Sequence, residues 1–502
     1  MRLPDRRLIL LGFALFVLSG VWLRPLLPID ETRYLAVAWE MRLGDHWIVP
    51  FKNGLPYDHK PPLLFWLINL VWLPGVSDFT GRLVAPAFSL ATIWATGRVS
   101  DTMGLGQRTG TAAMLILASF ACFQFFGLET GFDTMLALAV VLALGQIWKI
   151  GTRDDHRALD WVLLGAAMAL GLMSKGPVLF VHVLPSLLLL RLWAPRVAHA
   201  WRGVGAALAT CAGLVSLWLV PALILGGPEY REAVLWTQSA GRAVSSFVHA
   251  QPFWYYLVLI PVFVFPWGWL PVFWKRLPFD RAEKFLLIAV LGPLVVFSMI
   301  SAKQLNYLVP EMPWLAILLA RRFPEVLGRA WAAVAVLVVL GLAFPAMAAG
   351  LLGDEAQRLI SIPAAGVAAV VLLAGAVLIA KRGQLVYLTA TVALTALHLT
   401  YVVGPARQIM SPRQIAERVA PADGEIGIVA SIYHSEFHFS GRLTQPFAVL
   451  TTADEIAAFA EQHPDGLVLG RLGGAVLPTW EPDETIYYRN NDWAIWSNRN
   501  RE

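Results

Sequence analysis

Long apolar runs dominate this chain and leave it few ways to fold. It has 502 residues, of which 57% are hydrophobic and only 15% charged. Soluble domains carry about 25% charged residues, and about 18 apolar residues in a row can cross a bilayer. The runs predict thirteen membrane-spanning helices, near 8–27, 79–100, 108–127, 131–150, 158–173, 176–193, 202–225, 253–274, 283–301, 305–320, 329–350, 362–380 and 384–403.

The run 61–77 is treated differently, because it is short and begins with Pro61-Pro62. We expect it to lie on the membrane surface as a juxtamembrane helix. With the N-terminus inside, this choice makes every cytoplasmic loop basic, as the positive-inside rule requires. The basic residues of these loops are Arg98, Arg108, Lys149, Arg153, Arg157, Arg191, Arg196, Arg202, Lys275, Arg276, Arg281, Lys284, Arg321, Arg322, Arg329, Lys381 and Arg382.

Composition excludes several other readings. The net charge of +5 is modest, so nucleic-acid binding is not expected. Cys122 and Cys211 lie inside apolar runs, where buried free thiols are more common than a disulfide. The first apolar run follows Arg2, Arg6 and Arg7 but has no small-residue cleavage site before Asp30, so we expect an uncleaved helix and not a signal peptide.

The tail differs from the rest of the chain. After a membrane part covering 1–404, residues 405–502 predict a small α/β domain on the outer side. A helix is expected after Ser411-Pro412, and strands are expected near 425–433, 466–470, 484–489 and 492–497. Thr452 and Glu455 form a capping-box pattern for a helix over 456–462. The fold class is therefore an all-α polytopic membrane protein with a C-terminal α/β domain.

Reactive side chains gather in one outer loop, 28–78, which contains Asp30-Glu31-Thr32-Arg33-Tyr34 and Tyr57-Asp58-His59-Lys60. Ionisable groups at a membrane are costly to hold there without a use. A carboxylate such as Asp30 or Glu31 can act as a general base or help to hold a metal. The alternative is that Asp30 only caps a helix that begins near Thr32.

Lys60 is held on an extended backbone, because it precedes Pro61. A fixed ammonium beside Tyr57 and Arg33 suits a phosphate; the alternative is contact with lipid headgroups. His59 could hold a divalent metal (Zn, Mg or Mn) with the distant His249, although two lone histidines are more often not metal ligands.

Further outer loops add candidates. Asp133 is a second carboxylate, for which a helix cap is again the alternative. Lys175 lies at the hinge 174–177, which lacks the glycine-rich run of a nucleotide-binding loop. The loop 226–252 contributes Arg242, and Lys303 and Tyr307 can face the same cavity. Since the chain contains no nucleotide-binding domain, a phosphate site at the outer surface indicates a donor carried by a lipid.

Several motifs resemble the bacterial aminoarabinose lipid A transferases, which group with protein O-mannosyltransferase-like enzymes of the GT-C superfamily. The resemblance extends over roughly 8–320. It rests on the segments Asp30-Glu31-Thr32-Arg33-Tyr34, 44–50, Asn53-Gly54, Tyr57-x-x-Lys60-Pro61, Lys175-Gly176 and 252–256.

The resemblance implies thirteen membrane helices, periplasmic juxtamembrane helices and a periplasmic C-terminal domain in the bacterial inner membrane. It also implies transfer of a sugar from undecaprenyl phosphate to lipid A or lipopolysaccharide. For a single displacement we expect inversion of the anomeric centre. Matched by motif, the resemblance implies that Asp30 is the base or acceptor-orienting carboxylate, that Asp133 is a second important acid, that Lys60, Arg33, Tyr57 and Tyr307 hold the donor phosphate, and that His249 binds a metal. The residues themselves add catalytic Glu31, substrate-binding Tyr34, Lys175, Arg242 and Lys303, and metal-binding His59.

The chain departs from the family pattern at three places. Asp58-His59 stands where the family has Phe-Glu, Ala250 stands in place of a basic residue, and the segment 303–307 differs from Lys-Leu-Pro-Thr-Tyr. The metal ligands, the sugar or the acceptor can therefore differ. A protein O-glycosyltransferase remains open, and a lipid or oligosaccharide transporter is a weaker alternative, because the spans are mostly apolar. The other expected partners are membrane lipids, and the chain is expected to be a monomer.

Overall fold

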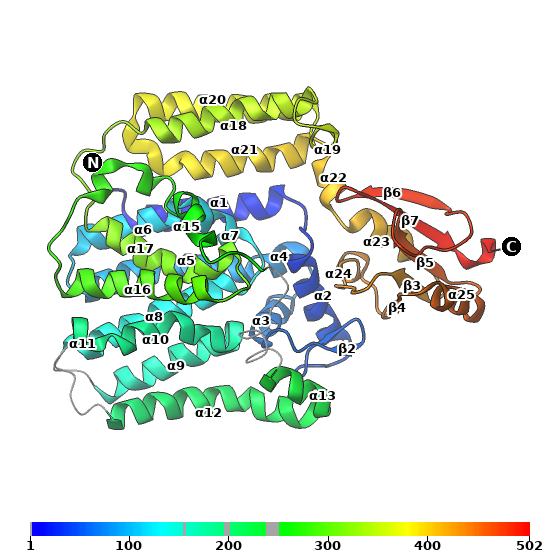
Figure 1. The fold of residues 1–502 in the computed structure, drawn as a ribbon, viewed down its shortest axis with the longest axis horizontal. Coiled ribbons are helices and arrows are strands. Elements are labelled where there is room, and N and C mark those ends of the chain that lie inside the picture. Colours follow the sequence, from blue (N-terminus) through cyan, green and yellow to red (C-terminus); the bar gives the residue numbers. More distant parts are fainter. Residues whose placement is uncertain (1–2, 154–156, 195–200, 237–249, 502) are drawn as a thin grey trace.

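The computed structural model describes residues 3–153, 157–194, 201–236 and 250–501. Its helices form an elongated bundle, and a small sheet domain lies against one end of that bundle (Figure 1). The centre of the bundle contains α1 (Arg6–Leu23), α5 (Val84–Thr102), α6 (Gln107–Ser119), α7 (Ala121–Leu128), α8 (Asp133–Thr152), α16 (Arg281–Met299) and α17 (Met312–Ala320).

Further helices flank this centre on two sides (Figure 1). One group consists of α9 (Ala158–Lys175), α10 (Leu179–Leu188), α11 (Leu190–Trp193), α12 (Trp201–Leu225) and α13 (Gly227–Glu232). The opposite group consists of α18 (Trp331–Ala348), α19 (Asp354–Arg358), α20 (Ile362–Lys381) and α21 (Thr389–Val403). The short helix α15 (Tyr255–Phe263) contacts both α7 and α16.

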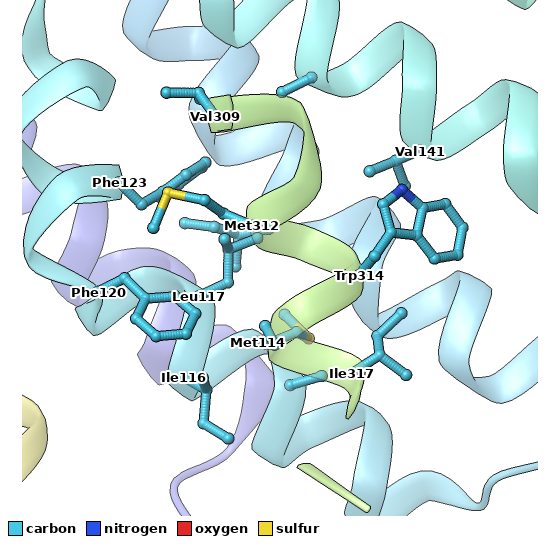
Figure 2. Packing of buried hydrophobic residues seen from close by; sticks show 14 of the residues in the cluster. Met114, Ile116, Leu117, Phe120, Phe123, Val141, Val309, Met312, Trp314 and Ile317 are labelled. Carbon is cyan, nitrogen blue, oxygen red and sulfur yellow. The ribbon is translucent and has the colours of Figure 1, made fainter. Parts of the chain in front are cut away.

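The core of the bundle is built around α17, which is apolar on every side. Met312, Trp314 and Ile317 of this helix are all buried. Figure 2 shows α17 between Leu117 on one side and Val141 of α8 on the other. A helix that is apolar on every side must be surrounded by other helices, which agrees with the burial of α17 inside the bundle.

Eight described helices are long and apolar enough to cross a membrane, and a ninth is obtained if the bent pair α6 and α7 counts as one span. The pair bends by 65°, where Phe120 adopts an extended backbone. The predicted span 253–274 contains only α15 and two 3-10 turns, with Pro261 inside the helix. The expected number of thirteen spans is therefore not confirmed.

The predicted surface segment 61–77 contains α3 (Leu63–Val71), followed by α4 (Asp78–Arg82). Nine residues of α-helix rise only about 14 Å, whereas the hydrocarbon core is about 30 Å thick. This helix is consequently too short to cross a bilayer. Cys122 and Cys211 are both buried and unpaired, which confirms the expectation of free thiols.

The C-terminal part contains a five-stranded sheet in the order β4-β3-β5-β7-β6. β3 (Ile426–Val429) is parallel to β4 (Ala448–Leu450) and β5 (Leu467–Arg471). β7 (Asn491–Ser497) is antiparallel to β5 and to β6 (Glu484–Tyr488). The helices of this part are α22 (Ala406–Met410), α23 (Arg413–Val419), α24 (His438–Gly441) and α25 (Ala453–Gln462).

Most of the tail agrees with the sequence prediction. Thr452 and Glu455 form the predicted capping box of α25, whose N-terminal N–H groups they satisfy. The three later strands lie within a residue or two of the expected ranges. The expected strand 425–433 is shorter, and β4 was missed, since its three residues lie at the edge of the sheet and carry too little pattern.

Candidate active site

The first predicted carboxylate lies at the start of α2 (Asp30–Leu43), directly after the first bundle helix. The Asp30 side chain is 65% exposed and forms an ion pair with Arg33, one turn further along α2. The residue before the helix is Ile29, which makes no side-chain cap. The alternative in which Asp30 caps a helix from Thr32 is therefore wrong. An acidic group in the first turn is favoured by the helix dipole.

Glu31 points the other way, into the protein. Its carboxylate accepts hydrogen bonds from the Arg24 guanidinium at 2.5 and 2.7 Å, from the Thr130 N–H at 2.8 Å and from the Leu27 N–H at 3.1 Å. Arg82 lies 3.9 Å away. Burial alone would raise the pKa of Glu31, but Arg24 and Arg82 outweigh it and lower the pKa to about 2. Glu31 thus joins α1, α4 and the segment before α8.

Several of the predicted substrate-binding residues lie around the aromatic ring of Phe132. The Tyr34 ring meets it edge to face with centroids 4.9 Å apart, and Phe65 of α3 lies at 5.8 Å. The Lys60 ammonium lies 5.9 Å from the centroid of the same ring. Tyr57 is buried and packs 6.0 Å from Phe65. Segments from three parts of the chain therefore meet at one place.

A second cluster adjoins the first, because Asp133 follows Phe132 directly. Asp133 forms an ion pair with Lys175 and accepts a 3.0 Å hydrogen bond from the Asn306 amide. The Lys175 ammonium also lies 5.1 Å from the centroid of the Tyr307 ring. α8 begins at Asp133 itself and Phe132 makes no side-chain cap, so the helix-cap alternative for Asp133 is also wrong.

The Asp133–Lys175 pair also fixes two helices relative to each other. α8 and α9 run antiparallel, and a second ion pair, Lys149–Asp160 at 2.5 Å, joins their far ends. A 20-residue helix is about 30 Å long, so the two pairs lie on opposite ends of the bundle. One end of α8 thereby carries the candidate site and the other carries one of the predicted basic loops.

Glu129 lies beside both clusters and was not singled out from the sequence. Burial raises its pKa to about 8, and the nearby carboxylates of Glu31, Asp133 and Asp30 add to this effect, against Arg24. Glu129 lies four residues before Asp133, and only Asp133 is predicted from the sequence as a site residue in this segment. Its environment depends on partners far away in the sequence, so no local pattern could have identified it.

Three predicted residues, Lys303, Arg242 and His249, remain to be considered. Lys303 donates to the backbone carbonyls of Gln251, at 2.8 Å, and Ile300, so backbone oxygens are hydrogen-bond partners of its ammonium. Arg242 and His249 lie outside the described residues.

For a metal, the described part of the chain offers little. His59 Nε2 lies 3.7 Å from Asp58 Oδ1, and the described residues include no group of three or more His, Cys, Asp or Glu side chains placed to hold a metal ion. These residues therefore do not by themselves fit a metal centre.

The C-terminal domain covers the loop 28–78. A two-residue turn, Asn53-Gly54, joins β1 (Phe51–Lys52) to β2 (Leu55–Pro56), with positive φ at both positions, as such hairpins require. The Glu40 carboxylate accepts hydrogen bonds from both turn N–H groups. The Asn53 amide then exchanges two hydrogen bonds with the Phe447 backbone, at 2.9 and 2.8 Å.

Other contacts extend this docking. The Lys52 ammonium donates to the Tyr433 carbonyl at 3.0 Å. The rings of Trp72 and Phe439 stack with centroids 5.1 Å apart and planes within 2°. The sheet domain is therefore held against the same loop that carries Asp30.

This docking brings His434 to the site. Burial lowers its pKa to about 4, and the positive charges of Arg33 and Lys52 add to the effect. At neutral pH the imidazole is therefore uncharged. Sequence reasoning missed His434, because it lies some four hundred residues from Asp30.

Comparisons with known proteins bear on this arrangement. The family described as dolichyl-phosphate-mannose-protein mannosyltransferase matches residues 59–224. The undecaprenyl phosphate-alpha-4-amino-4-deoxy-L-arabinose arabinosyl transferase of Erwinia tasmaniensis is 29% identical over 350 residues, which cover 68% of this chain and 63% of the relative. The Pseudomonas aeruginosa enzyme of the same name is 30% identical over 364 residues, which cover 68% and 64%.

The structure of ArnT from Cupriavidus metallidurans bound to undecaprenyl phosphate is similar over 97% of both chains, with a TM-score of 0.77 and 20% identity. The predicted resemblance is confirmed. At this identity, the structural likeness establishes that the chain has the fold of that protein. The matched regions span less than two thirds of the length of the curated relatives, at 63%, 54% and 56% for three of them.

Proposed function

We propose that this chain is an integral membrane glycosyltransferase that moves a sugar from a polyprenyl phosphate donor, such as undecaprenyl phosphate, to lipid A or lipopolysaccharide. The observation that carries the proposal is the ion pair between exposed Asp30 and Arg33, which adjoins the Asp133–Lys175 pair around Phe132. The names of the relatives and the undecaprenyl phosphate bound to the similar ArnT structure support the same donor.

In this proposal the donor phosphate lies near Arg33, Tyr57 and Lys60. Guanidinium and ammonium groups form charge-assisted hydrogen bonds with phosphate oxygens. The position of Lys60 over the Phe132 ring supports such a site, since the ring limits where the ammonium can go. Tyr34 and Tyr307 border the same region, and the predicted roles of Arg242 and Lys303 remain predictions.

Asp30 is the carboxylate that faces the acceptor, which is consistent with its 65% exposure. It accepts a proton from an acceptor hydroxyl or orients an acceptor phosphate that is already ionised. An acceptor oxygen then attacks the anomeric carbon, and the bond from that carbon to the donor phosphate oxygen breaks. The electron pair leaves with the polyprenyl phosphate, whose charge the nearby cations offset. A single displacement of this kind inverts the anomeric centre.

Glu31 and Asp133 have positioning roles in this scheme. Glu31 accepts hydrogen bonds from several protein donors, so it suits the anchoring of α2 below Asp30 better than proton transfer. Asp133 holds the Lys175 ammonium and the Asn306 amide beside the donor region. No step of the mechanism passes through a metal.

The proposed setting is the bacterial inner membrane, with the site and the sheet domain in the periplasm and the protein acting as a monomer. The predicted topology with thirteen spans puts the basic loops in the cytoplasm. The two ends of α8 support this orientation, since Asp133 and Lys149 are separated by the length of the helix.

A reconstituted transfer assay tests the proposal. Purified full-length protein is mixed with polyprenyl phosphate sugars and lipid A, and glycosylated lipid A and free polyprenyl phosphate are measured together. We expect both to appear in equal amounts with the wild type and neither with Asp30→Asn. Substrate movement across a vesicle without cleavage of the donor would instead identify a transporter.

The second candidate is a protein O-glycosyltransferase, which the match to the mannosyltransferase family over 59–224 favours. The chemistry of donor cleavage is the same, so only the acceptor separates the two. Supplying periplasmic proteins in place of lipid A in the same assay, with detection of sugar-modified peptides, distinguishes them.

A further inference from the structure

A pocket of about 230 Å³ lies where the sheet domain meets the start of α2. Its lining residues are Ile29, Arg471, Tyr488, Arg489, Asn491 and Trp493. Five of the six come from β5, β6, β7 and the turn between β6 and β7, in the C-terminal sheet (Figure 1). The sixth, Ile29, directly precedes Asp30, so the pocket adjoins the candidate active site.

The pocket is positively charged. Arg471 ends β5, and its guanidinium lies 5.2 Å from the centroid of the Trp493 ring. Arg489 lies in the turn between β6 and β7, where its backbone N–H donates to the Ile409 carbonyl at 3.1 Å. Within the described part of the chain, neither arginine forms an ion pair, whereas Arg418 and Arg499 of the same domain are each paired with a carboxylate.

One carboxylate, Glu436, is buried nearby. Burial raises its pKa, while the charges of Arg489 and Arg471 lower it. Even when Glu436 is ionised, one negative charge faces two guanidinium groups. The pocket therefore keeps a net positive charge that a bound anion can neutralise.

The wall of the pocket includes Tyr488, whose hydroxyl group is buried. Tyr488 is 2% exposed, and among the described residues its hydroxyl makes no hydrogen bond of good geometry, although Arg489 lies beside it. A buried hydroxyl without a well-aligned partner costs free energy, which an acceptor oxygen of a bound ligand would recover. The guanidinium groups donate as well, and together these groups favour an oxoanion with several acceptor oxygens.

We propose that Arg471, Arg489 and Tyr488 form an oxoanion site that holds a phosphate of the acceptor lipid next to Asp30. This inference rests on the proposed function, since it names the part of the site that binds the acceptor. It divides the work between two parts of the chain: the loop 28–78 binds the donor phosphate, and the sheet domain binds an acceptor phosphate. It also gives the C-terminal domain a role in choosing the acceptor.

The test uses the detergent-solubilised full chain and three probes: lipid A, the same lipid A with its phosphates removed, and inorganic phosphate. The variant combines Arg471→Gln with Arg489→Asn, because asparagine tolerates the positive φ of 49° at that turn position. The matched control combines Arg418→Gln with Arg499→Gln, which removes two arginines from the same domain. Tyr488→Phe removes the hydroxyl alone, and thermal melting checks that each variant folds.

We expect the variant to bind phosphorylated lipid A about tenfold more weakly than wild type, which corresponds to about 1.4 kcal/mol. Binding of the dephosphorylated lipid should stay unchanged, and the control should behave as wild type. Tyr488→Phe should show a smaller loss in the same direction. In the transfer assay, the KM for lipid A should rise while kcat and the KM for the donor stay the same.

Equal losses for both lipids, or an equal loss in the control, would overturn the proposal. A variant that weakens binding of inorganic phosphate but not of lipid A would also overturn it, since the pocket would then hold a free ion. These binding measurements need no sugar transfer. A wild-type protein without transferase activity would therefore refute the proposed function separately.

Discussion

Replacing Glu31 by glutamine should destabilise the fold, whereas replacing its neighbour Asp30 by asparagine should not. Both changes remove one negative charge and keep the shape of the side chain. Glu31 is buried with Arg24 and Arg82, so its loss leaves two guanidinium groups without their anion. Asp30 is mostly exposed, and its pair with Arg33 contributes about 0–1 kcal/mol.

The size of the Glu31 effect follows from two arguments. A pKa lowered from 4.5 to about 2 corresponds to about 3 kcal/mol at neutral pH. Breaking a buried ion pair by removing one partner typically costs about 3–5 kcal/mol. For a chain of this size we expect the melting temperature to fall by on the order of 5 °C. The 21 tryptophans provide the fluorescence signal for a thermal melt in detergent.

The stability difference between wild type and Glu31→Gln should also depend on pH. The folded protein lowers the pKa of Glu31, so its stabilising contribution is present above about pH 4.5 and is lost as the pH falls toward 2. The difference between wild type and Glu31→Gln should therefore narrow on acidification. If Glu31→Gln melts like wild type at neutral pH, or if Asp30→Asn loses as much stability, the assignment of an anchoring role to Glu31 is refuted.

Three further predictions follow from the site and its surroundings. Glu129→Gln should be more stable than wild type by a margin that grows between about pH 4.5 and about pH 8, because the folded state raises the pKa of Glu129 and disfavours its charged form. A difference in melting temperature between variant and wild type that does not change with pH would contradict this. Lys175→Met should lower kcat by roughly tenfold in the transfer assay by releasing Asp133, and an unchanged kcat would remove Lys175 from the site. Asn53→Ala should weaken docking of the C-terminal domain by about 2 kcal/mol, because it removes two hydrogen bonds to Phe447. Proteolysis near residue 405 should then be faster, and a rate equal to that of wild type would argue against this interface.

The sequence predicted the class of fold because the signals were long or local. Apolar runs of about twenty residues identify membrane helices without any knowledge of their partners. The capping box at Thr452 and Glu455 is contained in four residues and was found as predicted. β4 was missed because three edge residues carry no such pattern.

The number of spans was harder to predict than the membrane class. Hydropathy does not reveal where an apolar run bends or ends. Phe120 breaks the run that forms α6 and α7, and Pro261 lies inside the short α15. Both runs look continuous in the sequence, because each break depends on local backbone conformation and on packing against other helices.

The site shows the same limit at the level of single residues. The sequence indicated that Asp30 and Glu31 belong to an important loop but gave them the same role. Their difference comes from Arg24 and Arg82, which approach only in the fold. Likewise, the sequence could not show that backbone carbonyls of Gln251 and Ile300 bind the Lys303 ammonium. Which way a side chain points is decided by tertiary contacts that no local spacing encodes.

Mass spectrometry of envelope glycolipids tests the central claim most directly. Cells that lack this protein are compared with the same cells complemented by the wild type or by Asp30→Asn, with both proteins present at equal levels in the membrane. The account predicts that one lipid A or lipopolysaccharide species loses a sugar-sized mass in the deletion, regains it with the wild type and does not regain it with Asp30→Asn. Identical glycolipids in all strains would contradict transfer to lipid A, and full restoration by Asp30→Asn would contradict the role of Asp30.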